Sequence, residues 1–185
     1  MPEILKLLIR YKTPAIISTK SDLALRDYDL IDQLSRITYI NIAATVTTMD
    51  EQMRLLLEPG SSPSADRFKM LKAFRKTNAS VGLHLMPIIP YVTDHAENID
   101  QLLCHAAQCG VHYVLPGTLY LRGNTRSYFF GFISRELPHL YEKLKALYKT
   151  GGADKSYKDG LYETVNALRD KYGLSSSYMK PMREK

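Results

Sequence analysis

The sequence predicts an α/β protein in which about four parallel strand–helix units form part of a TIM-type barrel, followed by C-terminal helices. Short apolar runs alternate with helix-like segments, which is typical of parallel sheets with right-handed crossovers. Polar residues gather just after each run, where the loops of a barrel form its site. The runs are 15–19, 39–46, 81–86 and 111–115, and the segments at their ends are 18–20, 45–48, 87–90 and 119–122.

Helix-capping residues delimit the first two units. After the strand at 15–19, Asp27 is placed to cap an amphipathic helix. The second strand, 39–46, ends at Thr48-Met49-Asp50-Glu51, which has the spacing of a capping box. A short helix is therefore expected to start there, with Thr48 as its cap.

Proline and glycine mark the boundaries of the next two units. Pro63 is expected at the first position of a helix, and Gly110 suits the C-terminal cap of another. The other predicted boundaries are Pro59-Gly60 after the short helix, Pro87–Pro90 after the third strand and Pro116-Gly117 after the fourth.

After the fourth strand the pattern predicts helices alone. Gly151-Gly152 has the composition of a linker and divides the chain into a barrel-like domain, 1–150, and a C-terminal helix with a basic tail, 151–185. The expected helices are 127–136, 138–149 and 157–172, the first two separated at Pro138.

Composition excludes several classes of protein. The start of the chain does not resemble a secretory signal, and no apolar run approaches the twenty or so residues of a membrane span. A cytoplasmic protein without a membrane partner is expected. The two cysteines, Cys104 and Cys109, are about 140° apart around a helix axis, so they are interpreted as reduced structural thiols, and no metal site is predicted.

The formal net charge of +6 makes nucleic acid a possible partner. A solvated surface is the more ordinary interpretation of such charge. The basic residues expected to bind nucleic acid lie in the last forty residues: Lys155, Lys158, Arg169, Lys171, Lys180, Arg183 and Lys185.

The candidate ligand-binding residues lie near the predicted strand ends. Lys20, flanked by the hydroxyls of Ser18 and Thr19, suits a carboxylate or phosphate ligand, or is a surface lysine in a polar turn. Thr45, Thr47 and Thr48 can hydrogen-bond a ligand or are simply strand formers. Arg67 either binds a ligand carboxylate or, as the favoured interpretation, pairs with Glu58 to order the intervening loop.

His84 alternates with Leu83 and Leu85 along the third strand and therefore points to the opposite face of the sheet. In a barrel that face is the interior, so His84 can belong to a pocket. A hydrogen-bonded structural histidine is the favoured interpretation.

Several motifs occur in one order along residues 1–122. They are Ile17-Ser18-Thr19-Lys20-Ser21 with Leu25-Arg26-Asp27, Thr45-Val46-Thr47-Thr48 with Asp50-Glu51, Leu57-Glu58-Pro59-Gly60-Ser61-Ser62-Pro63 with Arg67, and Pro87-Ile88-Ile89-Pro90 with Asp94. Together they resemble the radical S-adenosylmethionine enzymes related to spore photoproduct lyase, often called DNA repair photolyase-like proteins.

The resemblance implies a six-unit partial barrel and two cofactors. In that family a Cys-x-x-x-Cys-x-x-Cys loop holds a [4Fe–4S] cluster, which reduces S-adenosylmethionine and releases a 5′-deoxyadenosyl radical. Carried over by position, Lys20 approaches the carboxylate of S-adenosylmethionine, and Thr45, Arg67 and Ser18 also belong to its binding site. No catalytic residue is assigned.

The sequence departs from the family pattern in one respect. The three-cysteine loop is missing, and the resemblance places residues 2–8 inside the second helix of the barrel. The chain is therefore expected to be the C-terminal part of a radical enzyme, lyase-like, and inactive alone because a cluster needs cysteine thiolates. The alternatives are a non-catalytic module that binds a nucleoside ligand, or one that binds nucleic acid through its basic C-terminal region.

Such a chain exposes an unpaired strand at the edge of its sheet. The expected partner is a second copy, giving a homo-oligomer, or a missing N-terminal half. Light scattering that shows a clean monomer at high concentration would contradict the association of two copies.

Overall fold

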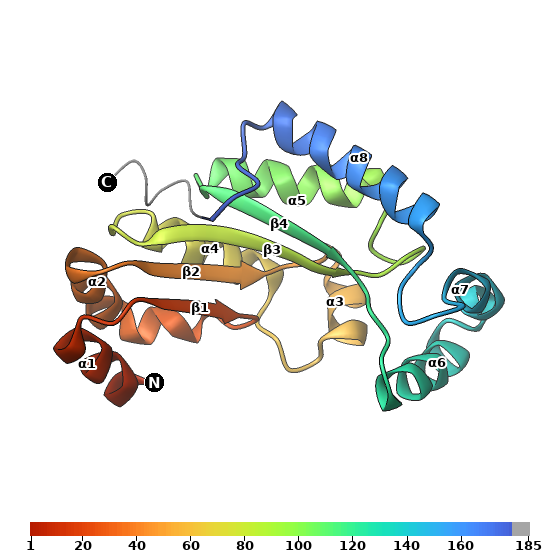
Figure 1. The fold of residues 1–185 in the computed structure, drawn as a ribbon, viewed down its shortest axis with the longest axis horizontal. Coiled ribbons are helices and arrows are strands. Elements are labelled where there is room, and N and C mark those ends of the chain that lie inside the picture. The colour runs from red at the N-terminus through yellow and green to blue at the C-terminus, as the bar shows by residue number, and fades with distance from the viewer. Residues whose placement is uncertain (179–185) are drawn as a thin grey trace.

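Four parallel strands, in the order β1-β2-β3-β4, form the sheet of the computed structural model, which describes residues 1–178 (Figure 1). The strands are β1 (Ala15–Thr19), β2 (Ile40–Thr45), β3 (Ser80–Ile88) and β4 (Tyr113–Thr118). Lys180, Arg183 and Lys185, three of the basic residues expected to bind nucleic acid, lie outside the described residues.

Helices alternate with these strands and then follow them, so the predicted fold class is confirmed. They are α1 (Pro2–Tyr11), α2 (Tyr28–Ile37), α3 (Glu51–Leu57), α4 (Ser64–Phe74), α5 (Ala96–Gln108), α6 (Asn124–Glu136), α7 (Tyr141–Leu147) and α8 (Lys155–Lys171), with 3-10 turns η1 (Asp22–Asp27) and η2 (Pro138–Leu140). Among the described residues, none of these helices has the length and apolarity needed to cross a membrane.

The strand period of two separates the sheet into an apolar and a polar face. Val81, Leu83 and Leu85 of β3 are fully buried in the main core, together with apolar residues of α2, α4 and α5. These three helices lie along one face of the sheet (Figure 1). This core fixes the strands whose carboxyl ends carry the candidate site.

The opposite face holds a chain of polar contacts. His84 Nδ1 lies 3.0 Å from Ser18 Oγ and its Nε2 lies 3.3 Å from the hydroxyl of Tyr113. That hydroxyl donates to Asn41 Oδ1 at 2.8 Å, and Asn41 Nδ2 donates to Ser80 Oγ at 3.0 Å. Burial lowers the pKa of His84 and raises the pKa of Tyr113. The interpretation of His84 as a hydrogen-bonded structural histidine is confirmed.

The C-terminal elements pack onto the sheet and onto one another. Helix α8 contacts α5 and β4, and its Leu161 and Val165 join the main core. Helices α6 and α7 form a second apolar core around Ile133, Leu144 and Tyr148. The division of the chain at residue 150 stays a prediction.

The predicted linker at Gly151-Gly152 is instead held in place. Gly151 O accepts a hydrogen bond from the N–H of Leu121 at 2.6 Å, and Gly152 forms an antiparallel bridge with Tyr120. A Cβ at Gly151 would lie 2.9 Å from the Tyr120 ring and 3.0 Å from Leu121 O. Glycine is needed here for the close approach of two backbones rather than for flexibility.

Two predicted helix starts are corrected. The cap of α3 is Asp50, whose carboxylate accepts the N–H groups of Gln52 and Met53, whereas Thr48 Oγ1 accepts the N–H of Asp50. Helix α4 begins at Ser64, so Pro63 occupies the cap position rather than the first turn. In both places more than one residue has suitable capping chemistry, and the local sequence pattern does not choose between them.

Two strands run past the prolines that were expected to end them. β3 continues through Pro87 to Ile88, at a point where its pairing with β4 shifts register between Leu85 and Ile88. β4 continues through Pro116 to Thr118. A proline is tolerated where the ladder is irregular, because its missing N–H then costs no ladder hydrogen bond.

Candidate functional site

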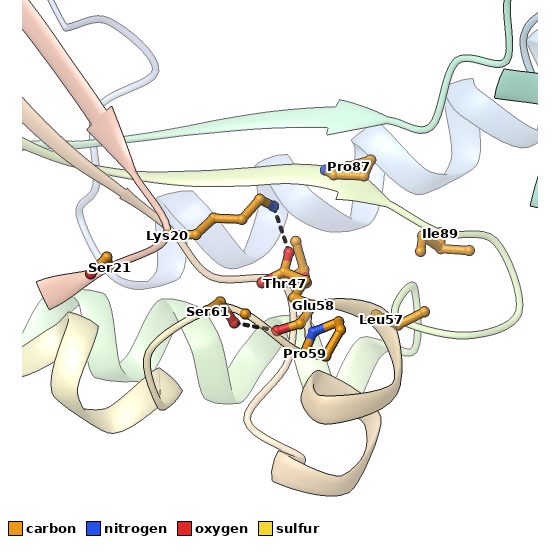
Figure 2. A pocket seen from close by; sticks show the side chains of 10 residues that line it. Lys20, Ser21, Thr47, Leu57, Glu58, Pro59, Ser61, Pro87 and Ile89 are labelled. Atoms are coloured by element: carbon orange, nitrogen blue, oxygen red, sulfur yellow. Dashed lines mark hydrogen bonds and ion pairs between the residues drawn. The ribbon is translucent and has the colours of Figure 1, made fainter.

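A cavity of about 460 Å³ opens at the carboxyl ends of the strands, between the loop after β1 and the loop after α3. Figure 2 shows Lys20 extending from the end of β1 toward Glu58, with Leu57, Pro59, Pro87 and Ile89 around them. The lining residues are Lys20, Ser21, Thr47, Leu57, Glu58, Pro59, Gly60, Ser61, Pro87 and Ile89. This is the edge of a parallel α/β sheet at which ligands bind.

Glu58 lies between two cations. Its Oε1 is 2.5 Å from Lys20 Nζ and its Oε2 is 3.1 Å from Arg67 Nη1. The side chain of Arg67 is 1% exposed, that of Glu58 is 12% exposed and that of Lys20 is 42% exposed. Arg67 therefore fixes the carboxylate from inside the protein, while Lys20 faces the cavity and can turn toward a ligand.

The guanidinium of Arg67 is occupied by its own loop. Besides Glu58, Nη1 donates to the carbonyl of Thr45 at 2.5 Å, Nε to the carbonyl of Ser62 at 2.9 Å and Nη2 to Ser61 Oγ at 3.1 Å. The favoured interpretation, an ion pair that orders the loop, is confirmed. Arg67 joins the end of β2 to the loop after α3 rather than lining the cavity.

A second arginine, Arg54, holds the same loop and was not recognised from the sequence. Its Nη1 donates to Ser61 O at 2.8 Å, and its Nε donates to Glu51 Oε2 at 2.5 Å. Burial alone would raise the pKa of Glu51, but hydrogen bonds from Arg54 and from the N–H of Ser64 outweigh it and lower that pKa. Arg54 and Arg67 together give the cavity a rigid wall at residues 58–62.

Of the four residues predicted to bind a cofactor, Lys20 lines the cavity directly. Ser18 lies two residues earlier on β1 and contacts His84, and Thr45 presents its carbonyl to Arg67. Thr47, which was considered as a ligand-binding hydroxyl, also lines the cavity, and so do Ser61, Pro87 and Ile89, which were not assigned to the site. Their position after β2, after α3 and at the end of β3 was the available signal, since strand-end loops build such sites.

The cavity combines one ammonium, one carboxylate and apolar walls. Lys20 can pair with a ligand carboxylate, and Glu58 can pair with a ligand cation. Leu57, Pro87 and Ile89 offer apolar surface to the rest of the ligand. This arrangement suits a zwitterionic ligand with an apolar or aromatic body.

The two cysteines do not suit an iron–sulfur cluster. Cys104 lies on α5 and Cys109 at its end, both half-buried and free, and neither lines the cavity. Burial raises the pKa of Cys109, which favours the thiol over the thiolate that cluster iron requires. The residues of this chain therefore do not provide the cluster ligands.

No protein-family model matches the chain. It is 31% identical over 179 residues to an uncharacterised protein of Mycobacterium tuberculosis, a match that covers 96% of this chain and 53% of that protein. An uncharacterised protein of Methanocaldococcus jannaschii is 26% identical over 160 residues, covering 84% of this chain and 53% of its own. The chain thus spans about half the length of the curated relatives it matches.

Solved structures of spore photoproduct lyase share the fold. A cysteine-to-serine mutant superposes with a TM-score of 0.67 at 12% identity, over 91% of this chain and 52% of that one. Another mutant, with bound AdoMet and dinucleoside spore photoproduct, gives a TM-score of 0.66 at 12% identity over the same shares of the two chains. This likeness confirms the predicted partial barrel fold.

Proposed function

We propose that this chain provides the S-adenosylmethionine-binding part of a radical S-adenosylmethionine enzyme. The observation that carries the proposal is the Lys20–Glu58 pair at the mouth of a cavity, at the carboxyl ends of the strands. The shared fold supports it, because a spore photoproduct lyase structure with that fold has bound AdoMet.

The roles of the residues follow from their charges. The ammonium of Lys20 would bind the carboxylate of S-adenosylmethionine, and Glu58 would bind its α-ammonium group. Thr47 and Ser61 bring hydroxyls to the same cavity. In this proposal Ser18, Thr45 and Arg67 do not contact the cofactor. They hold in place the strand end and the loop that carry Lys20 and Glu58.

The [4Fe–4S] cluster of the family would have to be held elsewhere. Because this chain does not provide its cysteine ligands, we propose that a further segment or another chain does so. Alone, the chain would bind the cofactor without cleaving it. The bound cluster would supply the electron for that cleavage.

Substitution of Lys20 tests the proposal. Lys20→Gln is expected to weaken binding of S-adenosylmethionine at least about tenfold, because a charge-assisted contact contributes about 1.5–3 kcal/mol. Isothermal titration calorimetry at one ionic strength measures this. Lys76→Gln, an equal charge change at an exposed lysine after the end of α4, is the control. Equal affinities for wild type and Lys20→Gln would refute the role of Lys20.

The free edge of β1 is the proposed place of association. β1 is an outer strand of the sheet, and its Ile16 is 58% exposed. On α1, the helix before it in the chain, Ile4 and Leu7 are 57% and 53% exposed. Unpaired strand edges bordered by apolar side chains associate with other strands. We propose that a second copy covers this edge when the chain is alone, and that further strand–helix units cover it in longer chains.

The expected result is a dimer in light scattering at high concentration. Ile16→Lys should shift it toward monomer, since a charge would lie at the edge. Leu55→Lys is the matched control, because Leu55 is similarly exposed, 53%, but belongs to α3 rather than to the edge strand. A clean monomer of the wild type at several hundred micromolar would exclude association of two copies.

A further inference from the structure

A second cavity, of about 450 Å³, lies in the hairpin formed by α6 and α7. This hairpin stands beyond the carboxyl ends of the strands (Figure 1). Its cavity shares no lining residue with the one at Lys20. The lining residues are Gly123, Asn124, Arg126, Ser127, Phe130, Tyr141 and Lys145.

The hairpin carries a net positive charge. Residues 119–150 contain six lysines and arginines and two glutamates. One of those, Glu136, pairs with Arg135 at 2.6 Å. Residues 154–171, which include α8, carry four basic and four acidic residues. Residues 119–150 therefore carry a net positive charge, whereas the charges of residues 154–171 balance. Binding of nucleic acid through the basic C-terminal region stays a prediction.

Cations and aromatic rings alternate around the cavity. The guanidinium of Arg126 lies 5.0 Å from the centre of the Phe130 ring, and Lys145 Nζ lies 5.5 Å from the centre of the Tyr141 ring. The two rings meet edge to face with their centres 5.6 Å apart. Such a wall presents both positive charge and flat apolar surface to one ligand.

Arg126 is fixed in position, whereas Lys145 is available. Arg126 Nη1 donates to the carbonyl of Thr150 at 3.0 Å and Nη2 to that of Tyr148 at 2.6 Å. These are neutral acceptors, so its charge is not compensated. Lys145 is exposed and has no carboxylate partner among residues 1–178. Both charges can therefore act on an anion in the cavity.

We propose that this cavity binds the phosphate of a nucleotide, either free or within a single strand of nucleic acid. Phosphate matches the two cations, and an aromatic ring provides a platform for the base. Tyr128 on α6 is 77% exposed and adjacent in sequence to Ser127, so its ring is free to stack with a neighbouring base. This site is separate from the S-adenosylmethionine cavity and does not depend on that cofactor.

Fluorescence anisotropy with a labelled single-stranded oligothymidylate of about ten nucleotides tests the site. Lys145→Gln is expected to weaken binding about five- to tenfold and to reduce the slope of log affinity against log salt by about 0.7. Tyr128→Ala is expected to weaken it about fivefold or more through loss of stacking. Lys76→Gln is the charge-matched control, because Lys76 is exposed after the end of α4.

Competition identifies the form of the ligand. If adenosine monophosphate displaces the labelled strand at a concentration similar to that of unlabelled strand, counted in nucleotides, the ligand is a free nucleotide. If only unlabelled strands displace it, the ligand is nucleic acid. Tyr128→Ala should leave competition by inorganic phosphate unchanged. The proposal is overturned if the wild type binds none of the probes at low salt. It is also overturned if Lys145→Gln and Lys76→Gln bind the labelled strand with equal affinity. Unchanged S-adenosylmethionine binding by Lys145→Gln separates this result from the proposed function.

Discussion

Replacing Arg67 by alanine is expected to lower the free energy of unfolding by about 3–5 kcal/mol. Arg67 is fully buried, and its removal leaves Glu58 without its inner cation. The carbonyls of Thr45 and Ser62 also lose their donor in a part of the protein with little access to water. Each uncompensated buried polar group adds to the loss. Urea unfolding followed by circular dichroism measures the change.

Arg36→Ala provides the matched control. Arg36 pairs with Asp32 at 2.6 Å, but its side chain is 70% exposed, so its loss should cost less than about 1 kcal/mol. Arg67→Lys should lower the free energy of unfolding by an amount between those of Arg36→Ala and Arg67→Ala, since lysine keeps the charge but not the planar guanidinium. A loss below about 1 kcal/mol for Arg67→Ala would show that the loop is not held as described.

Gly82→Ala is expected to destabilise the protein by about 1–3 kcal/mol or more. A Cβ at this position would lie 2.0 Å from the ring of Tyr113, which crosses β3 at this glycine. The ring has little room to move, because its hydroxyl donates to Asn41 and the residue is 1% exposed. The substitution should therefore disturb the polar chain from His84 to Ser80. Thermal unfolding measures the loss.

Gly131→Ala is the control for the glycine substitution. Gly131 lies inside α6 with nothing within 4 Å of an added Cβ. Alanine should stabilise the helix there by up to about 1 kcal/mol. The two substitutions add the same methyl group but should change the stability of the protein in opposite directions. Equal effects would mean that the close packing of Tyr113 on Gly82 does not determine the outcome.

Local sequence patterns predicted the elements because each depends on a short stretch of chain. Alternation along β3 placed His84 opposite Leu83, and the structure confirms both faces. Glycine at 110 was expected to end α5, and its φ of +70° suits that role. The prolines at 87 and 116 misled the prediction, because their cost depends on pairing with a neighbouring strand.

The candidate site was only partly predictable for a related reason. Lys20 was identified because it follows a strand directly. The pairing of Arg67 with Glu58 was the favoured interpretation, but its hydrogen bond to the carbonyl of Thr45, 22 residues away, could not be predicted from the sequence. Arg54 reads as an ordinary helix residue, and its contact with Ser61 depends on how the loop folds back. Because every residue has a backbone carbonyl, the sequence does not indicate which carbonyl an arginine will bind.

The most direct test of the central claim is a nuclear magnetic resonance titration of the labelled chain with S-adenosylmethionine. Binding at the described cavity predicts saturable shifts of the amide signals of its lining residues other than proline, at positions 20, 21, 47, 57, 58, 60, 61 and 89. The hairpin formed by α6 and α7 should remain unchanged. Shifts centred elsewhere, or none at millimolar cofactor, would contradict the assignment of this cavity to S-adenosylmethionine.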